Sequence, residues 1–304
     1  MLDRCCRILT CLFVVLSLCR AIPCVLASES TPDATGFTFH SAIQGSANSS
    51  AQVNRLEAGA GYVFNPKFAI DLGLPFYFVN SNLSTDPTQN GFRSGLGNAF
   101  VNFKITPTLA DWRYVSSLTA TAPTGDTDKG FSTGRVTVDW NNAISRSFSR
   151  FTPFVNLGVG NTISDTNFFY RPFSSLGLVG HFELGTTYLL ARSVSVGASA
   201  YSVVPSGEQK IYSRVTKRQN DTSQTPASNA SGQGAGRAFE TNHVILNDPG
   251  LARDHGFATW LTIYPSSTTF LQTGYHRSAA YSLNTFFFGV GLQLDPGHKR
   301  IKHP

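Results

Sequence analysis

The chain has 304 residues, with 24 Lys and Arg against 18 Asp and Glu and a formal net charge of +6. It contains no run of Lys or Arg and no strip of interleaved basic and aromatic residues, so nucleic-acid binding has no support. Charged residues are sparse at 14%, whereas Phe and Gly are abundant, and this composition suits a chain whose apolar surface need not be hidden from water.

Residues 1–27 have the layout of a secretory signal peptide. Two arginines precede an apolar run over residues 8–18, and small residues lead to a predicted cleavage site between Ala27 and Ser28. The apolar run is shorter than the roughly 20 residues of a membrane-spanning helix, although a retained membrane anchor is the alternative interpretation. All five cysteines lie in this segment, so the mature chain has no disulfide.

Residues 28–304 form a single predicted domain in which apolar and polar side chains alternate with a period of two. In residues 68–80, for example, Phe68, Leu72 and Phe76 share one apolar face, while Asp71 and Tyr77 lie on the other. Each such segment is near or above the roughly 9–11 residues with which a tilted strand crosses a bilayer. The predicted strands, about twelve, are roughly 36–44, 51–64, 68–79, 94–105, 112–122, 133–147, 151–162, 174–190, 193–204, 255–265, 268–278 and 283–294.

The predicted connections differ in length at the two ends of the strands. Short ones are expected at 65–67, 106–111, 149–150, 191–192 and 265–267, and longer ones at 80–93, 123–132, 163–173, 205–254 and 279–282. Outer-membrane barrels have short periplasmic turns and longer external loops. We therefore expect an external loop over 205–254, including the polar stretch 217–237, and a tail over 295–304.

Aromatic residues gather beside the short connections. They are Phe64, Phe68, Trp112, Tyr114, Phe148, Phe151 and Tyr188, and each is expected on the apolar face of its strand. Such rings form a girdle at a membrane interface, whereas a soluble sandwich, the alternative, would have to bury them. The sequence thus predicts an all-β protein, a transmembrane antiparallel up-and-down β-barrel of about twelve strands in the outer membrane of a Gram-negative bacterium. Its apolar face would meet outer-membrane lipid and lipopolysaccharide.

Residues 93–160 resemble the outer-membrane barrel family named for a MetA pathway of phenol degradation, whose members are described as transporters. The stretches that carry the resemblance begin at Arg93-Ser-Gly-Leu-Gly-Asn98 and Ala122-Pro-Thr-Gly-Asp126, followed by Ser132-Thr-Gly134. The family pattern has an acidic residue where this chain has Asn98. The resemblance covers about a quarter of the chain and implies a barrel that passes small hydrophobic or aromatic compounds.

The polar face of the predicted strands would line the lumen. This expected inward set comprises Arg55, Glu57, Asp71, Tyr77, Asn98, Asn102, Lys104, Arg113, Asp139, Asn141, Asn156, His181, Glu183, Tyr201, Gln272 and His276. Two interpretations are open: these side chains fill a narrow barrel as a paired network, or they form a polar constriction that selects what passes.

Three smaller features have a functional and a plainer interpretation. Asp126 and Asp128 could ligate calcium, but two acids in a Gly-rich loop favour a solvated turn. His181 and Glu183 could bind a metal or pass a proton, but without a third ligand nearby an ion pair in the lumen is favoured. Residues 217–237 could bind something at the cell surface, or be flexible filler.

An outer-membrane enzyme is a competing class. His276 and Ser278 have the H-x-S spacing that resembles lipid A deacylases, but Ala279 stands where those enzymes carry Asn, and no acidic partner is evident nearby. We therefore predict a channel or transporter for passive passage of small molecules, with no catalytic, cofactor-binding or metal-binding residue; the family resemblance implies that these molecules are hydrophobic or aromatic. A structural or adhesive barrel is the alternative.

Overall fold

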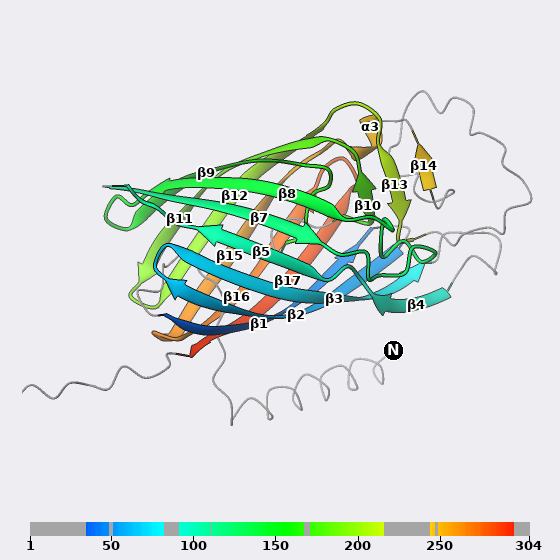
Figure 1. Cartoon of the computed structure of the whole chain (residues 1–304). Coiled ribbons are helices and arrows are strands. Elements are labelled where there is room, and N and C mark those ends of the chain that lie inside the picture. Colours follow the sequence, from blue (N-terminus) through cyan, green and yellow to red (C-terminus); the bar gives the residue numbers. More distant parts are fainter. Residues whose placement is uncertain are drawn as a thin grey trace, which may run out of the picture.

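A computed structural model describes residues 35–48, 51–81, 91–109, 111–166, 171–215, 244–246 and 249–294. These residues form an antiparallel β-barrel (Figure 1) with a small extra sheet at one end. Residues 1–34, 217–237 and 295–304 lie outside the described part, so the signal peptide, the polar stretch and the tail stay predictions. No helix in the described part is both long and apolar enough to cross a membrane.

Twelve strands close the barrel. They are β1 (Gly36–Ala47), β2 (Ala51–Asn65), β3 (Phe68–Ser81), β5 (Phe100–Ile105), β7 (Trp112–Thr121), β8 (Thr137–Arg146), β9 (Phe151–Gly160), β11 (Val179–Ala191), β12 (Val194–Pro205), β15 (Asp254–Ser266), β16 (Thr269–Ser278) and β17 (Leu283–Leu294). Each pairs with its neighbours along the chain, and β1 closes the circle by pairing with β17 from Phe37↔Leu294 to Ala47↔Asn284. Closure leaves no strand edge unpaired in the hydrocarbon, where an unsatisfied backbone group is costly.

The predicted alternation is confirmed. On β3, Leu72 and Leu74 are 55% and 39% exposed on the outside of the barrel, whereas Asp71 and Tyr77 are only 8% and 3% exposed on the inside. The same contrast recurs on the other barrel strands, whose exposed Phe, Leu, Ile and Val side chains give the barrel an apolar outer surface. An apolar outer surface of this size is compatible with lipid and not with water.

Aromatic side chains are exposed around the short-turn end, as expected. Phe64 and Phe68 flank the turn between β2 and β3, and Trp112 begins β7. The guanidinium of Arg146 lies over the rings of Trp112 and Phe148, at 5.4 and 5.1 Å from their centroids. A cation above rings at this level fits the boundary between hydrocarbon and headgroups.

Further elements lie at the other end of the barrel, where the longer connections gather (Figure 1). A three-stranded sheet, here called the cap, consists of β10 (Phe173–Leu176), β13 (Lys210–Ser213) and β14 (Val244–Leu246). The short helix α3 (Pro249–Ala252) precedes β15. Two more strands extend the main sheet: β4 (Gly91–Leu96) pairs with β3 at this end, whereas β6 (Thr108–Leu109) pairs with the start of β7 at the short-turn end.

Three predicted strands need correction. The segment 94–105 is interrupted. β4 pairs with residues 76–81 of β3 and β5 pairs with residues 68–73, and residues 97–99 between β4 and β5 pair with neither part of that strand. The segment 133–147 starts only at Thr137, because Gly134 adopts a φ of +68° in a turn. The segment 174–190 is two strands, because β10 pairs with β13 in the cap and only β11 joins the barrel. The predicted loop 205–254 likewise contains β13, β14 and α3.

Candidate functional site

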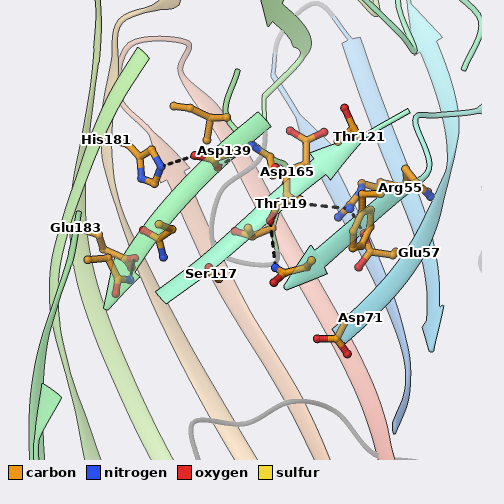
Figure 2. Close-up of a pocket in the computed structure, with 18 of the residues that line it drawn as sticks. Arg55, Glu57, Asp71, Ser117, Thr119, Thr121, Asp139, Asp165, His181 and Glu183 are labelled. Atoms are coloured by element: carbon orange, nitrogen blue, oxygen red, sulfur yellow. Dashed lines mark hydrogen bonds and ion pairs between the residues drawn. The ribbon is translucent and has the colours of Figure 1, made fainter. Parts of the chain in front are cut away.

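The barrel encloses a polar cavity of about 500 Å³. Its wall comes from nearly every barrel strand, and hydroxyl, amide, imidazole and charged side chains all contribute to it. Figure 2 shows Ser117, Thr119 and Thr121 projecting into it from successive inward positions of one strand, with charged residues on both sides. The volume lies in the range of known small-molecule sites, roughly 300–1,000 Å³.

The structure places fourteen of the sixteen expected inward residues on the wall of this cavity. They are Arg55, Glu57, Asp71, Tyr77, Asn98, Asn102, Lys104, Asp139, Asn141, Asn156, His181, Glu183, Tyr201 and Gln272. Asn98 arrives there from the break between β4 and β5 rather than from a strand, and its amide oxygen accepts the N–H of Gly125 at 3.3 Å.

Arg113 and His276 do not line the cavity. Arg113 sits one residue inside the short-turn end of β7, opposite Thr108 and Ser145. His276 is fully buried two residues before the last residue of β16, and the centroid of its ring is 5.1 Å from that of Tyr201.

The H-x-S pair belongs to a buried network. The hydroxyl of Ser278 donates to Asp254 at 2.6 Å, and Tyr201 donates to the same carboxylate at 2.9 Å. Asp254 is the acidic neighbour that the sequence did not reveal, because 24 residues separate it from Ser278. Since Ser278, His276 and Asp254 are all fully buried, their geometry fits a structural tie between β12, β15 and β16 better than an exposed nucleophile.

Glycines keep the cavity open. The ring of Trp260 lies so close over its cross-strand partner Gly197 that a Cβ there would fall 2.1 Å from the indole. His181 lies over Gly158 in the same way, as does Phe154 over Gly185. A ring that rests on bare backbone stays against the wall, so a barrel rich in inward rings still encloses free volume.

Most charged side chains on the wall have a partner of opposite charge or a hydrogen-bonding partner. Lys104 on β5 contacts Asp71 on the adjacent strand β3 at 2.7 Å, and Arg55 contacts Glu57 two residues away on the same strand, β2. His181 on β11 reaches over β9 to Asp139 on β8 at 2.9 Å, an interaction drawn in Figure 2. The paired network and the cavity coexist, so neither of the two interpretations of the inward residues excludes the other.

A segment between β9 and β11, residues 161–166 and here called the inner loop, folds against the cavity. Asp165 accepts hydrogen bonds from the hydroxyl of Tyr77 at 2.9 Å and from Arg214 at 2.7 Å. Gln44 on β1 donates to the carbonyl of Thr166, and Arg55 donates to the carbonyl of Asp165 at 3.4 Å. The loop predicted at 163–173 is therefore anchored in part to the barrel wall.

Buried arginines join the inner loop to the cap. Arg214 donates to the carbonyl of Arg171 at 2.7 Å and lies over the ring of Tyr77 at 4.5 Å. Arg171 donates to the carbonyl of Ile163 at 3.2 Å and to Ser175 at 3.0 Å. Burial lowers the pKa of Arg171, and the nearby carboxylate of Asp165 opposes that shift. These contacts hold the inner loop, β10 and the end of β13 together at the end of the barrel that carries the cap.

The smaller motifs have plain local roles in the structure. Asp126 accepts the N–H groups of Asp128 and Lys129 at 2.9 and 3.2 Å, as in a turn capped by its own side chain. Glu183 accepts a hydrogen bond from Asn156 at 2.6 Å, while its neighbour His181 pairs elsewhere. Within the described ranges, no three His, Cys, Asp or Glu side chains gather as metal ligands.

Several wall residues were absent from the sequence prediction. His40 follows the inward parity of β1 and could have been found, because exposed Phe37, Phe39 and Ile43 mark the opposite face. Asp165 and Arg214 lie in connections, where alternation gives no signal. Phe154 and Trp260 are apolar, so a search for polar inward residues passes over them.

The closed barrel with its apolar outer surface is a bacterial outer-membrane protein. No protein-family model matches the sequence, so the family resemblance of residues 93–160 stays a prediction. No curated protein matches the sequence either.

A search of solved structures finds similarity to outer-membrane proteins. The COG4313 outer membrane channel from Pseudomonas putida F1 superposes with a TM-score of 0.53 at 12% identity, over 87% of this chain and 99% of that chain. The NanC porin gives 0.49 at 11% identity, covering 84% of this chain and 100% of its own. The Ralstonia pickettii toluene transporter TbuX gives 0.42 at 8% identity, over 86% and 90% of the two chains. At 12% identity, the likeness to the COG4313 channel concerns the fold alone.

Proposed function

We propose that the protein is an outer-membrane channel for passive passage of small molecules, with the polar cavity as the chamber through which they pass. The cavity carries this proposal. A barrel with a purely structural or adhesive role can fill its interior with side chains, whereas this one packs several inward rings closely against glycines and keeps about 500 Å³ free. The fold shared with the COG4313 channel agrees with the proposal.

Neighbouring positions on β7 allow a matched test. Thr119 lines the cavity and Leu118 is 42% exposed on the outer surface. We expect Thr119→Trp to lower the single-channel conductance in planar bilayers severalfold, because the indole occupies the chamber. Leu118→Trp adds the same group on the lipid side and should conduct as the unmodified protein does.

Three results would count against the channel. A silent bilayer with correctly folded protein would overturn it, and so would equal conductance of both tryptophan variants. Removal of acyl chains from lipid A in expressing cells, detected by mass spectrometry and lost in Ser278→Ala, would establish the enzyme alternative instead.

A further inference from the structure

The charges on the cavity wall do not balance. Five carboxylates and three permanent cations line it, which leaves two negative charges when the imidazoles of His40 and His181 are neutral. Each permanent cation has a carboxylate beside it: Arg55 with Glu57, Lys104 with Asp71, and Arg214 with Asp165. The two remaining carboxylates are Asp139 and Glu183.

These two carboxylates have different surroundings. Asp139 contacts the imidazole of His181 at 2.9 Å and the N–H of Ser164 at 3.3 Å. Glu183 is half-buried on β11, and the contact found for it in the described part of the chain is the neutral amide of Asn156. In Figure 2, Glu183 lies below the dashed contact between His181 and Asp139, apart from that pair. Glu183 is thus the carboxylate whose charge is least compensated.

An aromatic surface adjoins Glu183. Phe154 lies two residues from Asn156 on the same face of β9, and its ring rests on Gly185, two residues from Glu183 on β11. The centroid of that ring is 6.2 Å from that of Trp260, and both rings line the cavity. Trp260 packs against Gly197 and shares a buried cluster with Phe154, Ala258 and Phe287, so this part of the cavity wall is apolar and aromatic.

We infer that the cavity binds small organic cations, amines that carry an apolar or aromatic group. The ammonium donates to Glu183, and the apolar part lies against Phe154 and Trp260. A charge-assisted hydrogen bond to a half-buried carboxylate favours a cation, and the aromatic rings beside it favour an apolar or aromatic group on that cation. The surplus negative charge raises the local concentration of cations and disfavours anions of the same size. Only the passage of these cations through the barrel rests on the proposed channel function. Their binding at Glu183 does not depend on it.

Benzylammonium, benzyl alcohol and benzoate share one ring and differ in charge, so they probe the site directly. Calorimetric titration of the detergent-solubilised protein should show binding of benzylammonium at least about tenfold tighter than of either other probe, the ratio expected from one charge-assisted hydrogen bond. Glu183→Gln should remove that preference. Glu208→Gln, a change of the same kind at an exposed position outside the cavity, should retain it.

A second measurement separates binding from passage. In bilayers under a KCl gradient, the reversal potential should show a preference for K⁺ that shrinks in Glu183→Gln. A conducting channel with equal permeability to K⁺ and Cl⁻ and equal binding of all three probes overturns the inference and leaves the channel standing. A silent bilayer with selective binding of benzylammonium overturns the channel and supports the site. If Glu183→Gln does not fold, the comparison of probes on the unmodified protein still decides.

Discussion

The ion pair that anchors the inner loop gives the most demanding prediction. Asp165 and Arg214 are 2.7 Å apart, and their side chains are only 7% and 4% exposed. Replacing Asp165 by Asn removes the negative charge and leaves the guanidinium of Arg214 buried without it. Breaking one side of a buried ion pair typically costs about 3–5 kcal/mol.

Most of this cost should fall on the attachment of the inner loop and not on the barrel. The strand ladders do not pass through residues 161–166, so the loop can detach while the barrel stays closed. Taking the lower figure, about 3 kcal/mol shifts the equilibrium between attached and detached loop by about a hundredfold. We expect amide exchange in residues 161–166 to accelerate by about that factor and the single-channel current of Asp165→Asn to become larger and noisier.

Asp111→Asn is the matched control. Asp111 also pairs with an arginine, Arg146, at 2.9 Å, but these side chains are 73% and 35% exposed at the short-turn end. Such a pair contributes about 1 kcal/mol or less, so neither exchange in the inner loop nor conductance should change. If Asp165→Asn matched Asp111→Asn in both measurements, the reasoning about the inner loop would be refuted.

Two further predictions concern the barrel wall and its orientation. Gly197→Ala should destabilise the barrel by about 1–3 kcal/mol in urea unfolding followed by gel mobility, because a Cβ would fall 2.1 Å from the indole of Trp260. Gly180→Ala is the control, because its Cβ would meet nothing nearer than 3.8 Å. Equal stability of the two variants would contradict the packing argument. Glu208→Cys should react with an impermeant maleimide on intact cells and Lys67→Cys should not, because Lys67 lies in a short turn, expected on the periplasmic side. All five native cysteines lie in the predicted signal peptide and should not interfere, and the opposite labelling would reverse the orientation.

The sequence alone determined the barrel. Alternation such as that around Leu72 is a local property, because a strand sends successive side chains to opposite faces whatever its partners are. Strand number, the unequal connections and the aromatic girdle follow from the same local pattern. For this reason, most predicted strands agree with the structure to within a few residues.

The strand errors arose where pairing, and not alternation, decides. Residues 173–176 alternate like a barrel strand, yet they pair with β13 in the cap, and only the position of a distant segment determines that choice. The break at residues 97–99 is of the same kind, since it depends on how β4 and β5 share one partner strand.

The character of the site was decided by tertiary structure. Parity placed Glu183 and Asp139 on the inner face, but which charge each one meets depends on the stagger of β8, β9 and β11. The contact between Asp165 and Arg214 joins two connections 49 residues apart, and connections carry no periodic signal. The free volume depends on rings such as Trp260 meeting a glycine on the adjacent strand, a register that the closed barrel fixes and no single strand contains.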